Sequence, residues 1–227
     1  MARKIQTEKD KKNKRIKITI ITIIAILILG AGGFCIWKLV INKNSPKPQT
    51  ITILDESLKE YGYSLNDKDS KYFKSEYEEL KNILKKDEIE EKEYATKVAR
   101  LFVIDFYTLS TKINKYDIGG NEFFYTDKKA MFEQKAMDTM YSSLQDNTYG
   151  DRKQELPEIK SVETVSTEET TYLLNDTKVD AYLVKLKMTY AKSLGYDDEA
   201  SVIICKENDL RWSVVDIKPT LNPKYNS

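Results

Sequence analysis

Residues 18–37 form an uninterrupted run without a charged side chain, and this feature constrains the chain more than any other. The run begins at Ile18 and ends at Trp37, with a lysine on either side. A helix of 20 residues, at about 1.5 Å per residue, spans about 30 Å, which is the hydrocarbon thickness of a bilayer. Because apolar residues continue beyond Trp37, we expect a transmembrane helix over residues 18–41.

The charges before this segment predict its orientation. Residues 1–17 hold eight basic and two acidic residues, which leaves 29 basic and 34 acidic residues in the rest of the chain. Basic residues next to a membrane segment are retained on the cytoplasmic side. We therefore expect a single-pass protein of the cell membrane, with residues 1–17 as a cytoplasmic tail and the C-terminal part outside the cytoplasm.

Two alternatives for the apolar segment stay open. Cleavage at the small residues Ala31, Gly32 and Gly33 would make the segment a signal peptide, although the uncharged run is long for one. A lipid anchor at Cys35 is disfavoured, because Phe34 stands where such a site needs a small residue. Apolar sequence directly after the glycines favours the uncleaved anchor.

The remaining chain divides simply. Residues 42–50 are polar and contain two prolines, which is typical of a linker. Residues 51–221 show no internal repeat and no long low-complexity stretch, so we expect one extracytoplasmic domain. Residues 222–227 are expected to form a flexible polar end.

The first half of this domain has helical periodicity. Apolar residues recur at helical spacing from Phe73 to Leu84, after Asp69 or Ser70 as a candidate helix cap. A second helix is expected over about residues 89–113 and a third over about 127–144. The centre of the second helix, LFVIDFYTL, is apolar nearly all round and is therefore expected to be covered on several sides.

The second half alternates between apolar and polar residues, which is typical of half-buried strands. The clearest alternation covers residues 182–190. Further strands are expected at 159–165 and 170–174 (one strand or a pair) and in a hairpin of 200–206 with 210–217. Asn175 and Asp176 are a turn signal. Three helices followed by about four antiparallel strands predict an α+β domain whose helices pack on one sheet face.

This order of elements, with a terminal hairpin that ends in NDLRWSVVDIKP, resembles the cystatin-like cone fold of the nuclear-transport-factor-like superfamily. Together with a basic tail and one membrane span, it is similar to the bitopic scaffold subunits of type IV secretion and conjugation machines. The resemblance covers most of residues 69–219 and implies an assembly role, and no catalytic residue of the family is carried over because no motif aligns residue by residue. Residues 51–65 lie outside it, and the sequence YGYSL at 61–65 is a candidate for an extra strand.

Enzymatic chemistry has little support in the composition. The chain has no histidine, which excludes Ser-His and Cys-His catalysis and the commonest transition-metal ligands. Asp105 is the most unusual polar residue, because it lies in the middle of LFVIDFYTL. A cone-shaped fold can enclose a pocket, so an alternative function is the binding of a small apolar ligand that Asp105 and Tyr107 orient. We expect no catalytic residues and no cofactor.

An interaction surface is predicted near the two glycines of DIGGNEFFY, residues 117–125. The glycines predict a turn, and aromatic residues give much contact area in protein interfaces. The candidate interaction residues are Tyr116, Phe123, Phe124 and Tyr125. The partner is expected to be an unidentified envelope protein or a second copy of the chain.

Other ligand classes are disfavoured. The acidic cluster at residues 197–199 lacks the spacing of a calcium loop, so no metal site is expected. The exported part has a net charge of −5 and no basic stripe, which argues against nucleic acid as a partner. The sequence thus favours a membrane-anchored interaction or assembly protein of the cell envelope, in contact with the bilayer through residues 18–37.

Overall fold

A computed structural model describes residues 47–219 of the chain. The expected cytoplasmic tail (1–17), the transmembrane helix (18–41) and the flexible end (222–227) lie outside the described residues and stay predictions. Within residues 47–219, no helix combines the length and the apolar character needed to cross a bilayer.

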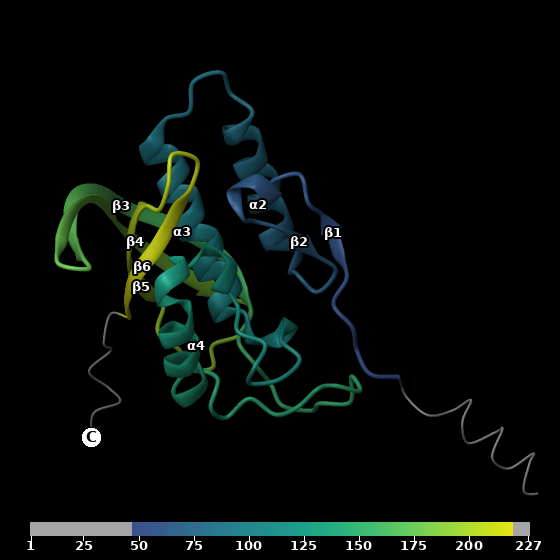
Figure 1. The fold of residues 1–227 in the computed structure, drawn as a ribbon. Coiled ribbons are helices and arrows are strands. Elements are labelled where there is room, and N and C mark those ends of the chain that lie inside the picture. Colours follow the sequence, from purple (N-terminus) through teal and green to yellow (C-terminus); the bar gives the residue numbers. More distant parts are fainter. Residues whose placement is uncertain (1–46, 220–227) are drawn as a thin grey trace, which may run out of the picture. The chain divides into compact units, whose positions relative to one another are not determined.

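In the described part, helices precede a four-stranded antiparallel sheet (Figure 1). The α-helices are α2 (Lys71–Leu84), α3 (Glu91–Tyr107) and α4 (Lys129–Asp138). The strands are β3 (Ile159–Leu174), β4 (Thr177–Tyr190), β5 (Glu199–Lys206) and β6 (Trp212–Pro219), and they lie in this order across the sheet. The predicted α+β class, with helices before an antiparallel sheet, is confirmed for this part of the chain.

Shorter elements surround these helices. Two strands, β1 (Ile53–Asp55) and β2 (Leu65–Asn66), form a small antiparallel sheet before α2. The 3₁₀ helices are η1 (Lys59–Tyr61), η2 (Leu109–Thr111), η3 (Asn121–Phe123) and η4 (Thr126–Lys128). The extra strand considered for YGYSL exists only at its last residue, where β2 begins.

Helix α2 begins and ends where the sequence predicts. The hydroxyl of Ser70 accepts a hydrogen bond from the backbone N–H of Phe73 at 3.1 Å, which caps the first turn. Phe73, Tyr77, Leu80 and Leu84 are all buried, as their helical spacing predicts.

Helix α3 is the central element and is shorter than the predicted 89–113. It ends at Tyr107 because Thr108 leaves the helical conformation, and its hydroxyl then accepts a hydrogen bond from the N–H of Ile159 at 3.2 Å. The four residues 101–104 are fully buried, since α3 packs against α2 on one side and the sheet on the other. The expectation that this segment is covered on several sides is confirmed.

Helix α4 is also shorter than predicted, ending at Asp138 instead of residue 144. Thr139 has φ −122° and ψ −96°, which breaks the helix. Tyr141 and Leu144 are still buried, because the turns after Thr139 fold back on the core. The apolar stripe therefore predicted burial correctly and the helix end wrongly.

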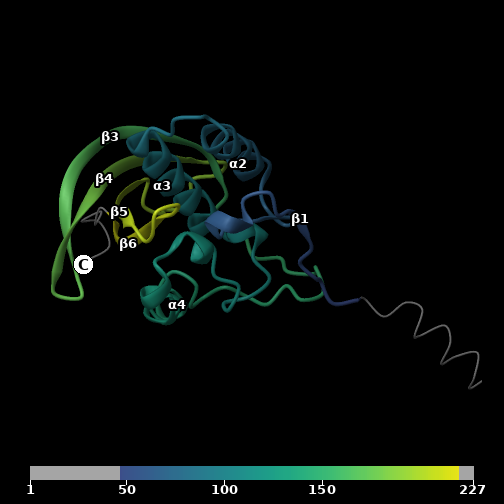
Figure 2. The same cartoon turned by 45° about the horizontal axis from the view of Figure 1, so that its top comes forward.

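The sheet contains one long β3 strand where the sequence left one strand or two open. The predicted turn at Asn175 and Asp176 joins β3 to β4, and both residues have positive φ, as in a tight two-residue hairpin. Strand β5 pairs with β4 only between Ala181 and Lys187, so the tip of the β3–β4 hairpin extends past it. Figure 2 shows this hairpin curving around α3 and projecting beyond β5 and β6.

The core lies on the concave face of the sheet, which holds α3 and the residues packed around it. A second, small apolar cluster lies on the opposite face. It consists of Leu174, Ala181, Cys205 and Val215, with partly buried neighbours that include Tyr125. Cys205 is a buried thiol in this cluster, and burial raises its pKa to about 11, which keeps it protonated and unreactive at neutral pH.

Candidate functional site

Asp105 lies at the C-terminal end of α3 and contacts the loop that contains Gly119 and Gly120. One carboxylate oxygen forms an ion pair with the ammonium of Lys112, and the other accepts a hydrogen bond from the N–H of Gly120 at 2.6 Å. Burial opposes the charge of Lys112, but the Asp105 carboxylate raises the pKa of Lys112. The carboxylate therefore fixes the loop to α3, and its hydrogen-bonding capacity is largely used within the fold.

Two further carboxyl groups surround this ion pair. Burial is the main cause that raises the pKa of Asp69 to about 6, and the charge of Asp105 adds to the shift. Burial likewise raises the pKa of Glu122 to about 8, again with a contribution from Asp105. The carboxylate of Glu122 accepts hydrogen bonds from the N–H and hydroxyl of Ser64, at 3.0 and 2.9 Å.

The raised pKa values of Asp69 and Glu122 are not accompanied by an arrangement of groups for catalysis. Each acid is hydrogen-bonded to backbone or to a neighbouring side chain, and no nucleophile paired with a base lies beside them in the described residues. In the same part of the chain, no three His, Cys, Asp or Glu side chains lie close enough to hold a metal ion. The arrangement can hold a loop in place and can store a proton.

The proton on Glu122 has a measurable consequence. Because its pKa is about 8 in the fold and 4.5 in the unfolded chain, its contribution to stability is greatest below pH 4.5 and declines as the pH rises towards 8. Glu122→Gln keeps an oxygen for Ser64 and removes the titration. We expect the variant to be more stable than wild type by about 4 kcal/mol at pH 8.

Urea unfolding at pH 5 and pH 8 measures this effect. The difference between Glu122→Gln and wild type should shrink to less than about 1 kcal/mol at pH 5, because Glu122 stays neutral in the fold and this pH lies close to its pKa in the unfolded chain. A variant that is less stable than wild type at pH 8 would contradict a neutral Glu122.

Tyr107 lies apart from Asp105, about 200° around the same helix. It lines an apolar cavity of about 290 Å³ with Phe106, Phe132, Met140 and other residues of α4, β6 and the loop before β5. Asp105 is not among the lining residues. The structure thus separates the two residues expected to orient a small apolar ligand, and that alternative now concerns Tyr107 and this cavity only.

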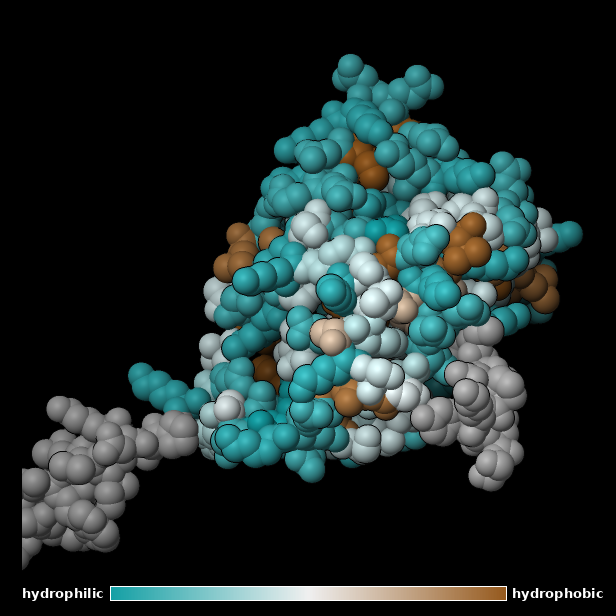
Figure 3. Space-filling view, turned by 180° about the vertical axis from the view of Figure 1, so that it is seen from behind, coloured by the Kyte–Doolittle hydropathy of each residue, from teal (hydrophilic) through white to brown (hydrophobic). Residues whose placement is uncertain are grey.

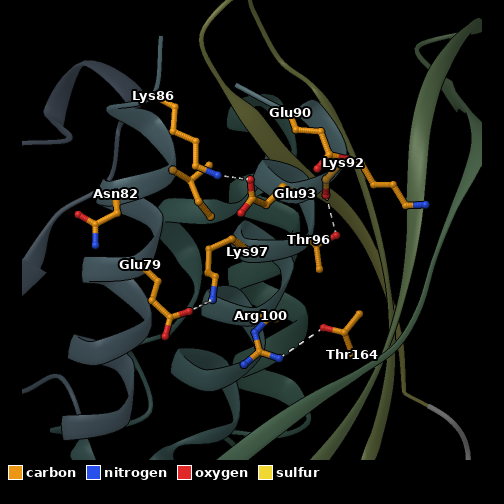
Figure 4. A pocket seen from close by; sticks show the side chains of 11 residues that line it. Glu79, Asn82, Lys86, Glu90, Lys92, Glu93, Thr96, Lys97, Arg100 and Thr164 are labelled. Carbon is orange, nitrogen blue, oxygen red and sulfur yellow. Dashed lines mark hydrogen bonds and ion pairs between the residues drawn. The ribbon is translucent and has the colours of Figure 1, made fainter. Parts of the chain in front are cut away.

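A larger hollow of about 690 Å³ lies between α2 and α3 and reaches Thr164 on β3 (Figure 4). Its charged side chains pair mostly with one another. Lys86 binds Glu93 at 2.6 Å, and Lys97 binds Glu79 at 2.6 Å. The hollow therefore has little free charge for a ligand, and its ion pairs join the two helices.

The predicted interaction residues do not form one surface. Phe123 and Phe124 are buried in the core, where Phe124 stacks on the ring of Phe132 with centroids 4.2 Å apart. Tyr125 is partly buried against the second apolar cluster, and its N–H donates to the carbonyl of Val214 at 2.8 Å. Among these residues only Tyr116 is largely exposed, at 70%. The correction has a simple cause: the two glycines turn the following aromatic residues inward.

The chain around Phe124 and Tyr125 covers the outer edge of β6, whereas β3 has an open edge. In β3, Tyr72 and Arg100 bind the outward N–H and C=O of Val162, at 3.0 and 2.7 Å. Beyond a bulge at Val165, alternation in the β3–β4 ladder turns the backbone groups of every second residue outward. These residues are Thr167, Glu169, Thr171 and Leu173. In the part of the chain that the structure describes, their outward groups have no hydrogen-bond partner.

A groove runs along the concave side of this edge, where the hairpin projects beyond α3. We call it the arm groove; it has a volume of about 420 Å³ and is lined by Glu91, Glu169, Thr170, Thr171, Asp180, Ala181, Tyr182 and Trp212. The rings of Tyr182 and Trp212 form its floor, with centroids 5.1 Å apart. Burial raises the pKa of Tyr182, and the nearby carboxylates raise it further. Acidic charge therefore lies beside the floor of the groove.

No family model, curated protein or solved structure matches this chain. The site must therefore be judged from its own geometry. The surface opposite the view of Figure 1 is mostly hydrophilic, with hydrophobic residues in small separate patches (Figure 3). The open strand edge offers unpaired backbone groups at the surface, and the arm groove beside it holds Glu169 and Asp180, which form no ion pair within the described residues.

Sequence reasoning did not find the arm groove. Its residues come from α3, β3, β4 and β6, which are far apart in the chain. One signal was present: residues 161–174 have neither lysine nor proline, the residues that usually protect an edge strand. That signal has meaning only once β3 is known to lie at the edge of the sheet.

Proposed function

We propose that the protein is a single-pass membrane protein whose domain outside the cytoplasm binds protein partners and has no catalytic activity. The open edge of β3 is the observation that carries the interaction role, because an unpaired strand edge is a template for another chain. The basic tail and the uncharged segment 18–37 are the support for membrane anchoring.

Within this proposal, the chain is a scaffold or assembly component of the cell envelope, of the kind found in secretion or conjugation machines. An anchor restricts the domain to one surface and raises its local concentration near membrane partners. The structural use of Asp105, Lys112 and the α2–α3 ion pairs favours a binding role over an enzymatic one.

Photo-crosslinking in intact cells tests the interaction role. A benzoylphenylalanine residue at Thr171 places the reactive group at the open edge, and the same residue at exposed Asp151 is the matched control. We expect a discrete crosslinked product from position 171 in the membrane fraction and none from position 151. Equal products from both positions, or none from position 171, would argue against a partner at this edge.

Protease treatment of spheroplasts or protoplasts tests the topology separately. Digestion of the domain from outside, with the N-terminal tail protected, is the expected result. Full protection of the domain would refute the proposed orientation without affecting the crosslinking result.

A further inference from the structure

The open edge of β3 lacks lysine and proline, the two residues that most often protect an edge strand, over residues 161–174. Between Val165 and Leu174 it consists mainly of Ser, Thr, Glu and Tyr. Two features protect this edge in part: the bulge at Val165, which is itself 61% exposed, and the carboxylates of Glu163, Glu168 and Glu169. The outward backbone groups from Thr167 to Leu173 suffice to pair with a strand of about six or seven residues.

The arm groove gives this edge a chemical preference. Three carboxylates line it, and no basic side chain does. Glu91 is paired with Lys206 at 2.5 Å, whereas Glu169 and Asp180 form no ion pair within residues 47–219. An aromatic floor beside free carboxylates suits the ammonium or guanidinium group of a basic side chain, through charge and cation–π attraction.

We propose that β3 accepts an extended basic segment of a partner protein as a fifth strand, whose Lys or Arg side chains enter the arm groove. This inference rests on the proposed interaction function and specifies the chemistry of its partner. Residues of one strand face recur about every 6.6–7 Å, so every second residue of the partner faces the groove. Glu169 and Asp180 bind its basic side chains, and the outward groups of Thr167, Glu169, Thr171 and Leu173 bind its backbone.

A second copy of the chain fits this edge less well. Pairing β3 with another β3 places Glu163 and Glu169 of both copies along one strand pair, and neither of them forms an ion pair within residues 47–219, whereas Glu168 pairs with Lys185 at 3.2 Å. Like charges facing each other across a strand pair are destabilising. The charge of the groove also repels nucleic acid.

A peptide titration on the full chain in a neutral detergent tests the proposal. The chain has two tryptophans, so Trp37→Phe leaves Trp212 in the arm groove as the single fluorescent tryptophan. The probe is the acetylated and amidated peptide TKTKTKT, and the comparison peptide is TETETET. We expect saturable change in Trp212 fluorescence with the lysine peptide and none with the glutamate peptide at the same concentrations.

Two variants in this background separate charge from strand pairing. Glu169→Lys combined with Asp180→Lys should weaken binding of the lysine peptide by roughly tenfold or more. Thr171→Pro should weaken it similarly, because it removes an outward N–H and leaves the β4 ladder intact. Asp151→Lys changes an exposed charge away from the groove and should leave binding within about twofold of the unmodified background. Circular dichroism checks that each variant is folded.

Each contrary result has a defined meaning. Equal weakening by Asp151→Lys, or equal binding of both peptides, would overturn the assignment of the groove as a basic-segment site. Unchanged binding in Thr171→Pro would overturn strand addition. If the lysine peptide does not bind but position 171 still crosslinks in cells, the proposed interaction function survives and the basic-segment proposal fails. If the lysine peptide binds but position 171 gives no crosslink in cells, the arm groove is a site for basic segments and the proposed interaction function in the cell fails.

Discussion

Gly119→Ala is expected to destabilise the domain by about 3 kcal/mol or more, because the added methyl group would overlap backbone atoms that cannot move aside without breaking other contacts. A methyl group on Gly119 would clash with the carbonyl oxygen of Asp105 and lie 2.7 Å from Cε of Lys112. Moving the loop away would break the hydrogen bond from Gly120 to Asp105 and the bond from the Gly119 N–H to the hydroxyl of Tyr141, at 3.0 Å.

Thermal unfolding followed by circular dichroism measures the effect. For a domain of this size, a loss of that order lowers Tm by roughly 6–12 °C. Gly150→Ala is the matched control: its φ is +74°, but the nearest atom to an added methyl group is 3.5 Å away. We expect the control to lose only about 1 kcal/mol, from backbone strain alone. Equal losses in both variants would show that the close approach to α3 has no effect.

This contrast also shows how far the sequence predicted the loop. The glycine pair predicted a turn between two helices, which the structure contains. The pair could not predict that the turn packs against the last turn of α3, because that requires the position of Asp105 relative to the loop. Phe123 and Phe124 were therefore assigned to the surface, although they complete the core.

The sequence predicted the fold better than it predicted the site. Periodicity gave α2 and the approximate positions of the strands along the chain, because burial of one face is a local constraint on each element. Helix ends were less accurate, since the backbone leaves the helical conformation at Thr108 and Thr139, and no spacing of apolar residues encodes this. The arm groove could not be predicted from the sequence, because it depends on how far the β3–β4 hairpin projects past β5.

Glu76 gives the second large prediction. Its carboxylate is buried on α2 and binds two cations of α3: Arg100 at 2.5 Å and Lys97 at 2.7 Å. Arg100 also donates to the hydroxyl of Tyr72 at 3.0 Å and to the carbonyl of Val162, so one network joins α2, α3 and β3. Glu76→Ala leaves both cations without their shared partner. We expect a loss of about 3–5 kcal/mol, which is typical when one member of a buried ion pair is removed.

A surface pair on the same helix is the control. Glu78 lies 3.5 Å from Lys81 and its side chain is 55% exposed, so Glu78→Ala should change stability by less than about 1 kcal/mol. Guanidinium chloride would screen these charges, so urea unfolding is the appropriate measurement. A small effect of Glu76→Ala, close to that of Glu78→Ala, would mean that water or a shifted side chain replaces the lost carboxylate.

The pH dependence separates the charge of Glu76 from its packing. Burial would raise the pKa of this carboxyl, but hydrogen bonds from Arg100 and Lys97 lower it to about 2, against 4.5 in the unfolded chain. Its stabilising contribution, about 3 kcal/mol, is therefore complete above pH 4.5 and is lost as the pH falls towards 2. The difference between wild type and Glu76→Ala should shrink over that range. Glu122 titrates in the opposite sense at higher pH, so the combined contribution of these two acids to stability is greatest near pH 4.5.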